Sequence, residues 1–266
     1  MTSIQETLSH RWTVRAEPFS VRTADGLAIA GTRLGDPDRS RPALVMAHGL
    51  MGWHRKPRFA TFAERMTPWF APYPFDLRGH GRSEGASDFG RDEIYDVDAV
   101  ARRAREDGHD LVLTLGMSLG AISVLRHAGI LGGTDGVASI SSLAYWDWHE
   151  GAQPIARRRM QARIGTRGGR RALRLWGVRI TDAWEPPESP EDVIGKIAPA
   201  PVVLVHGTDD HLFPPVHAER LYEAANDPRR LLLGTGFGHA EDGLSPAFAE
   251  RLAGTLYAEL GLPWSG

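Results

Sequence analysis

Three short stretches of this 266-residue sequence carry side chains that suit nucleophilic catalysis. Ser118 lies in a Gly-Met-Ser-Leu-Gly turn, Asp209 and Asp210 lie in His-Gly-Thr-Asp-Asp-His, and His239 lies in Gly-Phe-Gly-His-Ala. A serine hydroxyl is a weak nucleophile unless a neutral imidazole takes its proton. That imidazole needs a carboxylate on its other nitrogen to fix its tautomer and offset its developing charge. We therefore predict Ser118 as nucleophile, His239 as base and Asp210 as orienting acid, with Asp209 as an alternative acid.

An acyl-transfer site also needs hydrogen-bond donors for the negative charge that develops on the substrate oxygen. The backbone N–H groups of Leu119, directly after the serine, and of Leu50, after a His-Gly pair, are the candidates for this oxyanion hole. Gly116 and Gly120 would allow the sharp strand-to-helix turn that exposes a nucleophile. Taken alone, the motif is equally compatible with a tight turn that contains an incidental serine.

The candidate residues follow short apolar runs of the kind that predict buried strands. Such runs occupy 43–49, 71–79, 110–116, 136–142, 201–207 and 229–235, and helix-compatible segments at 91–107, 118–130, 214–227 and 245–260 alternate with them. This alternation predicts a parallel sheet with right-handed crossovers, and the carboxyl ends of its strands would bring the candidate residues together. A hairpin at 18–34, turning at Ala24-Asp25-Gly26, adds antiparallel strands. We predict an α/β fold with a mostly parallel central sheet, helices on both faces and a helical cap insertion.

The alternation stops between residues 143 and 197, and we interpret this segment as a cap inserted within a single domain spanning 1–266. Nine arginines and no acidic residue lie between Ile155 and Arg179. An anionic substrate group could bind there. We favour a solvated basic face, because apolar residues recur there at helix-like spacing and acidic residues follow from 182 to 192.

Four tryptophans are candidates to line a substrate pocket. Trp146, Trp148 and Trp184 lie in the cap segment, and Trp53 follows the predicted oxyanion loop. Ligand pockets are mostly apolar with a few placed polar groups, which aromatic side chains suit. Ordinary packing explains these tryptophans equally well.

Five blocks together resemble the α/β-hydrolase superfamily of serine hydrolases, in which esterases and lipases carry an inserted cap. In chain order they are HGLMG at 48–52, DLRGHGRS at 76–83, GMSLGA at 116–121, HGTDDHLFP at 206–214 and GFGHA at 236–240. The resemblance covers about residues 18–260, and its H-G-x-x-D-x-x-x-P pattern assigns the acid to Asp210. It also implies an ester, thioester, amide or activated C–C bond as substrate, because relatives with an aspartate nucleophile act on other bonds.

Composition excludes several other classes. The formal net charge of −2 and the pI of about 6.6 argue against a nucleic-acid partner. No apolar run reaches the roughly 18–20 residues of a membrane span, and the first residues lack a signal-peptide core, so we expect a soluble cytoplasmic protein. There are no cysteines for disulfides or thiolate metal sites. We expect neither cofactor nor metal, since the His and Asp residues near 206–211 lack a third ligand group elsewhere; the oligomeric state stays open.

The sequence thus predicts a serine hydrolase that cleaves a carboxylic ester of a small or medium-sized substrate through an acyl-enzyme intermediate. A thioesterase, a C–C bond hydrolase or an amidase would use the same residues, because these enzymes differ in leaving group and pocket. A non-catalytic ligand binder and a lyase that uses Ser118 and His239 without acylation are alternatives from other classes.

Overall fold

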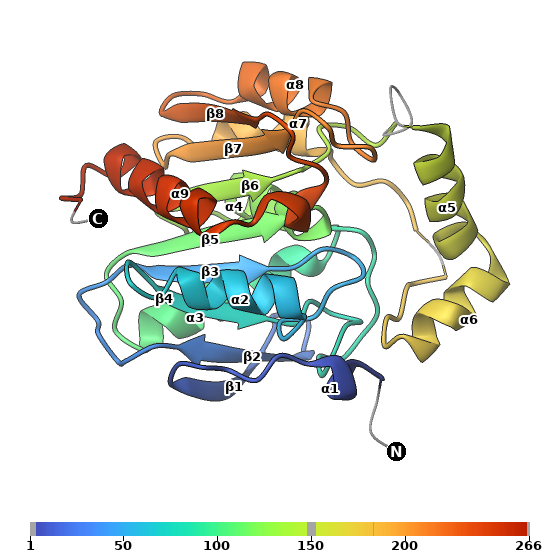
Figure 1. Cartoon of the computed structure of the whole chain (residues 1–266), viewed down its shortest axis with the longest axis horizontal. Coiled ribbons are helices and arrows are strands. Elements are labelled where there is room, and N and C mark those ends of the chain that lie inside the picture. Colours follow the sequence, from blue (N-terminus) through green and yellow to red (C-terminus); the bar gives the residue numbers. More distant parts are fainter. Residues whose placement is uncertain (1–3, 148–152, 183, 265–266) are drawn as a thin grey trace.

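The computed structural model describes residues 4–147, 153–182 and 184–264. Within these residues, eight strands form one sheet in the order β1-β2-β4-β3-β5-β6-β7-β8 (Figure 1). They are β1 (Ala16–Arg22), β2 (Ala28–Leu34), β3 (Ala43–Ala47), β4 (Ala71–Phe75), β5 (Val112–Met117), β6 (Gly136–Ile140), β7 (Val202–Gly207) and β8 (Arg229–Gly234). The hairpin β1–β2 and the β2–β4 pair are antiparallel, and the other pairs are parallel. The predicted α/β architecture with a mostly parallel sheet is confirmed.

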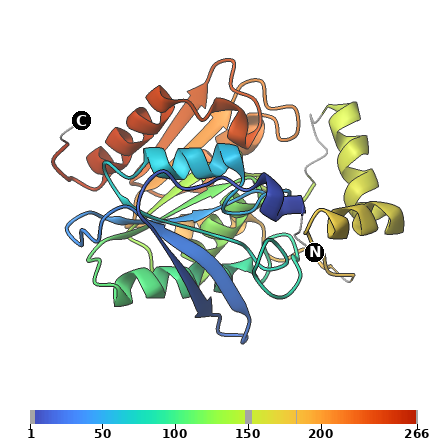
Figure 2. The same cartoon turned by 60° about the horizontal axis from the view of Figure 1, so that its bottom comes forward.

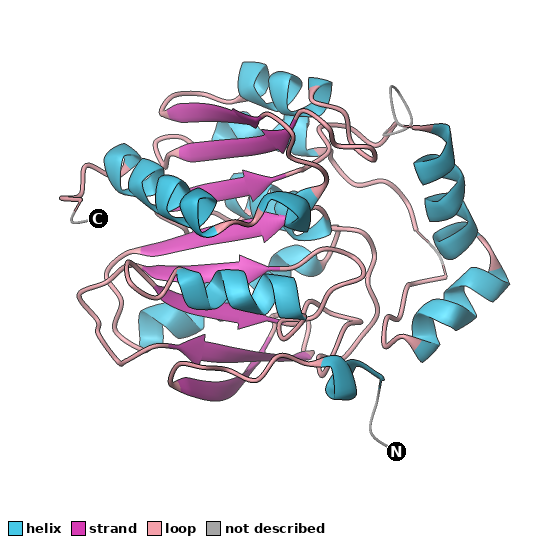
Figure 3. Cartoon of the chain, viewed as in Figure 1, coloured by secondary structure: helices cyan, strands magenta, loops and turns pink. Residues whose placement is uncertain are grey.

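Helices and helical turns connect these strands (Figure 3). They are α1 (Ile4–Leu8), α2 (Pro57–Arg65), α3 (Glu93–Glu106), α4 (Leu119–Ile130), α5 (Pro154–Gly165), α6 (Arg167–Leu175), α7 (Pro190–Val193), η1 (Ile194–Lys196), α8 (Val216–Ala224), η2 (Ala240–Gly243) and α9 (Pro246–Glu259). In the part of the chain covered by the structure, none of the helices has the length and apolarity that crossing a membrane requires.

The central strands are buried on both faces, which explains why their sequences are continuous apolar runs. Successive side chains of β3 enter different cores: Val45 belongs to the core that includes residues of α3, α4 and α8, whereas Met46 belongs to the core that includes residues of α2 and α9. Figure 2 shows these helices on opposite sides of the sheet. The sheet therefore holds the carboxyl ends of its parallel strands in a rigid, two-sided core.

Helices α5 and α6 lie beyond the carboxyl ends of the parallel strands, apart from both helical layers (Figures 1 and 2). No residue of α5 is fully buried, and in α6 only Leu173 is. The chain then returns to the core, where Val193 and Ile194 are completely buried. The excursion therefore ends earlier than the predicted 143–197 segment, because α7 and η1 pack against α4.

Candidate active site

Ser118 occupies a strained turn between β5 and α4. Its backbone has φ 53° and ψ −113°, a conformation that L-residues rarely adopt and that occurs mainly where surrounding structure enforces it. Two glycines make the turn possible: a Cβ on Gly116 would lie 2.1 Å from the carbonyl oxygen of Gly120, and one on Gly120 would lie 2.2 Å from that of Ala47. The Ser118 N–H donates to Ile140 O at 2.9 Å, which ties the turn to β6.

The structure brings Ser118, His239 and Asp210 together from the ends of three strands. The Nε2 atom of His239 lies 2.9 Å from Ser118 Oγ, and its Nδ1 atom lies 2.8 and 3.0 Å from the two carboxylate oxygens of Asp210. Asp209 is exposed and instead accepts a hydrogen bond from Thr208 Oγ1 at 3.1 Å. Of the two acids that the sequence left open, Asp210 is the one that contacts the imidazole. We call these three residues the Ser–His–Asp cluster.

The surroundings of Asp210 favour its ionised form. Burial raises the pKa of this carboxyl, but the hydrogen bond from His239 and the charge on that ring outweigh burial and hold the pKa below its usual value. The backbone N–H groups of Leu212 and Phe213 both donate to Asp210 Oδ1 at 2.9 Å. A carboxylate whose ionised form is favoured thus lies against the imidazole nitrogen that faces away from the serine.

The peptide between Gly49 and Leu50 is fixed beside Ser118. A Cβ on Gly49 would lie 3.4 Å from the Cβ of the serine, so this backbone passes very close to it. The Gly49 carbonyl accepts from Gly52 N at 2.8 Å and from His48 Nδ1 at 2.8 Å. Burial lowers the pKa of His48 to about 3, and its neutral Nε2 accepts from Leu77 N at 3.2 Å. The Leu50 N–H points to the opposite side of this trans peptide.

The backbone N–H of Leu119, the second predicted oxyanion donor, lies at the start of a helix. Leu119 is the first residue of α4, and first-turn N–H groups of a helix have no acceptor within the helix. Across the described ranges, the Leu50 N–H likewise donates to no other group. The two predicted oxyanion donors are thus backbone groups next to Ser118 whose hydrogen-bonding capacity is not used internally.

This arrangement agrees with comparisons to known proteins. A sequence model of the alpha/beta hydrolase family matches residues 44–259. The chain belongs to the alpha/beta hydrolase family. It is 26% identical to the uncharacterized protein YfhR of Escherichia coli strain K12, over 91% of this chain and 80% of that protein. It is 28% identical to YfhR of Salmonella typhi, over 92% and 79% of the two chains.

Solved structures share the fold of this family member at low sequence identity. The Pyrococcus furiosus esterase Pf2001 superposes with a TM-score of 0.73 at 17% identity and covers 94% of this chain and 97% of its own. The alpha/beta hydrolase GrgF from Penicillium sp. sh18 gives 0.72 at 18%, over 94% and 100%. The esterase RhEst1 from Rhodococcus sp. ECU1013 gives 0.69 at 17%, over 92% and 98%.

Ser118 opens onto an apolar cavity of about 270 Å³. The side chains that line this apolar cavity come from the sheet end and from the inserted segment: Leu50, Phe89, Ser118, Leu119, Ile122, Leu143, Trp146, Met160, Ile164, Trp184, Leu212 and Phe213. Trp146 and Trp184, two of the tryptophans predicted to line a pocket, both lie in this lining, and their rings meet edge to face at a centroid distance of 5.4 Å. Trp148 lies outside the described residues.

The placement of Trp53 differs from the prediction. Its side chain is only 4% exposed and lies in neither cavity beside Ser118. The ring packs edge-on against Trp176 at 6.2 Å, and its indole N–H donates to Ser9 Oγ at 2.9 Å. The prediction of Trp53 as a pocket residue is therefore wrong, because packing and a hydrogen bond occupy this side chain completely.

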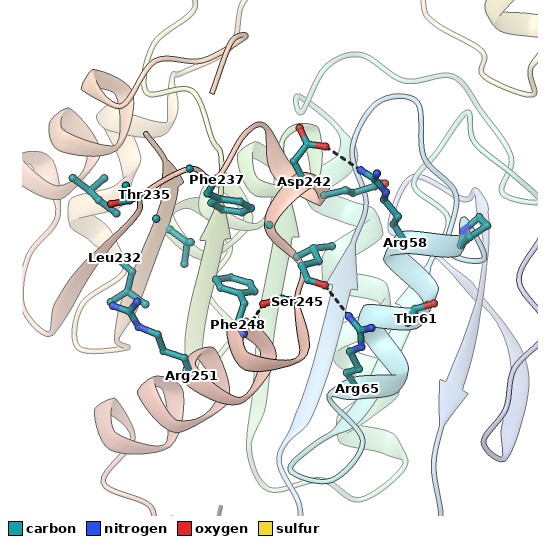
Figure 4. A pocket seen from close by; sticks show the side chains of 18 residues that line it. Arg58, Thr61, Arg65, Leu232, Thr235, Phe237, Asp242, Ser245, Phe248 and Arg251 are labelled. Carbon is teal, nitrogen blue, oxygen red and sulfur yellow. Dashed lines mark hydrogen bonds and ion pairs between the residues drawn. The ribbon is translucent and has the colours of Figure 1, made fainter. Parts of the chain in front are cut away.

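A second, more polar cavity of about 590 Å³ meets the first at Ser118. We call it the arginine cavity; its lining includes Ser118, His239, His211, Lys56, Arg58, Arg159, Arg163, Glu241 and Asp242. A third cavity, of about 720 Å³, lies between α2, β8 and α9 and does not reach Ser118 or His239 (Figure 4). The chemistry of the Ser–His–Asp cluster therefore faces the first two cavities.

Several lining residues were not identified from the sequence as pocket residues. Phe89 has φ 61° and meets the Trp184 ring at 5.8 Å, but its Asp-Phe-Gly context carries no motif. Met160 and Ile164 were recognised only as helix-spaced apolar residues. Their role depends on which face of α5 turns toward Ser118, and spacing alone does not determine that face.

Proposed function

We propose that this chain is a serine hydrolase that cleaves a carboxylic ester through an acyl-enzyme intermediate, with Ser118, His239 and Asp210 as catalytic triad. The observation that carries the proposal is the 2.9 Å separation of Ser118 Oγ from His239 Nε2, at the mouth of an apolar cavity. Nucleophilic catalysis by serine needs this contact between hydroxyl and base, with a third group that orients the base.

In the first half-reaction, Ser118 Oγ attacks the ester carbonyl carbon while its proton passes to His239 Nε2. The carbonyl electron pair moves onto the oxygen, whose negative charge is stabilised by the N–H groups of Leu50 and Leu119. The tetrahedral intermediate then collapses, the C–O bond to the alcohol breaks, and the departing alkoxide takes the proton from His239. The alcohol leaves and an acyl ester of Ser118 remains.

In the second half-reaction, His239 removes a proton from a water molecule that attacks the acyl carbon. Collapse of this second intermediate breaks the bond to Ser118 Oγ, which regains its proton from His239. The carboxylic acid leaves. Asp210 remains ionised throughout and offsets the positive charge that forms twice on the imidazole.

The apolar cavity favours a small or medium-sized hydrocarbon group on one side of the ester. Its volume of about 270 Å³ lies just below the range of roughly 300–1,000 Å³ typical of small-molecule sites. The proposed cap, formed by α5 and α6, contributes Met160 and Ile164 to the wall of this cavity. We propose that the inserted segment thereby selects the substrate.

The first test is intact-mass analysis after brief exposure to a small fluorophosphonate. Ser118 would displace fluoride from phosphorus, and we expect a single adduct on the wild-type protein that is lost in Ser118→Ala. His239→Ala should slow labelling strongly. His211→Ala is the matched control, because its ring lies 6.2 Å from that of His239 and should not be needed for labelling.

A panel of esters, thioesters and amides with short apolar acyl groups then identifies the bond that is cleaved. Faster turnover of thioesters or amides than of esters would replace the ester assignment while leaving the triad in place. Turnover without any acyl adduct would favour a lyase. Absence of both an adduct and turnover, with ligand binding unchanged in Ser118→Ala, would favour a ligand-binding protein and overturn the hydrolase proposal.

A further inference from the structure

The arginines of α5 lie on different faces of this helix. Residues 155, 156, 159, 160 and 163 line the arginine cavity, as expected for one face of a helix with 3.6 residues per turn. Arg159 and Arg163 therefore lie one turn apart on the face toward Ser118. Arg157 and Arg158 line neither cavity beside Ser118. All four arginines are solvent-exposed, as the solvated-face interpretation expects, but Arg159 and Arg163 also line the cavity that reaches Ser118.

The acidic groups of the arginine cavity are already paired. Lys56 Nζ lies 3.0 Å from Glu241. Arg58 lies 3.0 Å from Asp242, and Figure 4 shows this second pair. Arg159 and Arg163 form no ion pair or hydrogen bond with any described residue. Like charges four residues apart on a helix repel each other. A bound anion would offset the repulsion between Arg159 and Arg163.

We propose that Arg159 and Arg163 bind a carboxylate carried by the substrate, so that the preferred substrates are anionic esters. The inference rests on the proposed ester hydrolase function and names the substrate class of the same site. The apolar and arginine cavities share Ser118, Leu50, Met160 and Leu212, so the two cavities meet at the nucleophile. The ester bond then lies at Ser118, the hydrocarbon part lies in the apolar cavity, and the carboxylate lies against the two arginines.

The charge on the substrate follows from the cavity lining. Guanidinium groups bind carboxylates with two parallel hydrogen bonds, which suits two arginines on adjacent turns. The carboxylates of Glu241 and Asp242 belong to the same cavity, but each is paired with a cation, so the positive charge of Arg159 and Arg163 remains to attract an anion. A carboxylate on the substrate would supply this negative charge.

The test compares matched pairs of esters in which a terminal carboxylate replaces a terminal methyl group. One pair carries the change on the alcohol and the other on the acyl part, so the test also shows which part enters the arginine cavity. For wild type, we expect kcat/KM for the anionic member of one pair to exceed that of its neutral partner by about tenfold or more, mainly through KM. In R159Q/R163Q this ratio should fall to about one, and taking a ratio cancels any general loss of activity.

The matched control is R157Q/R158Q, which removes the same charge from the same helix outside both cavities. It should keep the wild-type ratio. An equal kcat/KM for anionic and neutral esters in both pairs would overturn the inference, and so would an equal loss of preference in the two double variants. Hydrolysis of neutral esters together with fluorophosphonate labelling would show that the proposed function still stands. Without turnover of any ester and without labelling of Ser118, both proposals fail.

Discussion

Asp209 and Asp210 are adjacent acids with very different surroundings. Asp210 is 7% exposed and faces His239, whereas Asp209 is exposed and contacts Thr208. Two backbone N–H groups and the imidazole together keep the buried carboxylate charged. The same three contacts fix its orientation, so Asp210 can hold only one tautomer of His239, with the proton on Nδ1 and the free lone pair toward Ser118.

Replacement of Asp210 by Asn should therefore lower kcat by about 10³–10⁴-fold, because the amide can leave His239 in the wrong tautomer. The volume and most hydrogen bonds are retained, so Tm should change by only a few degrees. Steady-state kinetics on the best ester of the panel measures the effect. Asp209→Asn is the control and should retain nearly full kcat; a comparable loss in this variant would contradict the assignment of the acid.

The turn between β5 and α4 is the element that positions the nucleophile. A side chain at Gly120 would collide with the carbonyl oxygen of Ala47 at the end of β3, and β3 leads directly into Gly49 and Leu50. The nucleophile and the proposed oxyanion donor are thus held together by close backbone packing between two neighbouring strand ends. Neither backbone can move without disturbing the other.

Gly120→Ala should lower the free energy of unfolding by about 1–3 kcal/mol, the usual cost of overpacking, and reduce kcat because the Leu50 N–H is displaced. Denaturant unfolding and kinetics measure the two effects. Gly168→Ala in α6 is a matched control, since its added Cβ would meet no atom within 4 Å and Ala is the better helix former. Wild-type stability and kcat in Gly120→Ala would show that the turn tolerates a side chain.

The whole molecule was only partly predictable from its sequence. The strands and their order along the chain were predictable, because a strand buried on both faces needs a continuous apolar run such as 43–47. The Ser–His–Asp cluster followed, since the carboxyl ends of parallel strands converge. The orientation of α5 and the burial of Trp53 were not predictable, because they depend on the rotation and packing of elements that are distant in sequence. Phe89 gave no signal, as its role arises from its backbone conformation.

The loop between β4 and α3 is hydrogen-bonded to the end of the inserted segment. Ser87 N donates to Arg179 O at 2.8 Å, and Thr181 N donates to Ser87 O at 2.9 Å. The next residue, Asp88, is 6% exposed. Burial, together with the hydrogen bond and charge of the neighbouring Glu93 carboxyl, raises the pKa of Asp88 to about 7. The Asp88 carboxyl therefore binds its proton more tightly in the folded state than in the unfolded chain.

This shift should make the stability of the molecule depend on pH. A raised carboxyl pKa stabilises the fold fully below the ordinary value of 3.8, and the stabilisation is lost as pH rises toward 7. Between pH 4 and 8, the Tm of wild type should therefore fall by about 2–4 °C relative to that of Asp88→Asn. In this variant the amide stays neutral and its oxygen can still accept from Asp92 N. Glu106→Gln on the exposed face of α3 removes the same charge and should follow the wild-type profile. Parallel profiles for wild type and Asp88→Asn would instead show that ionisation of Asp88 does not limit stability in this range.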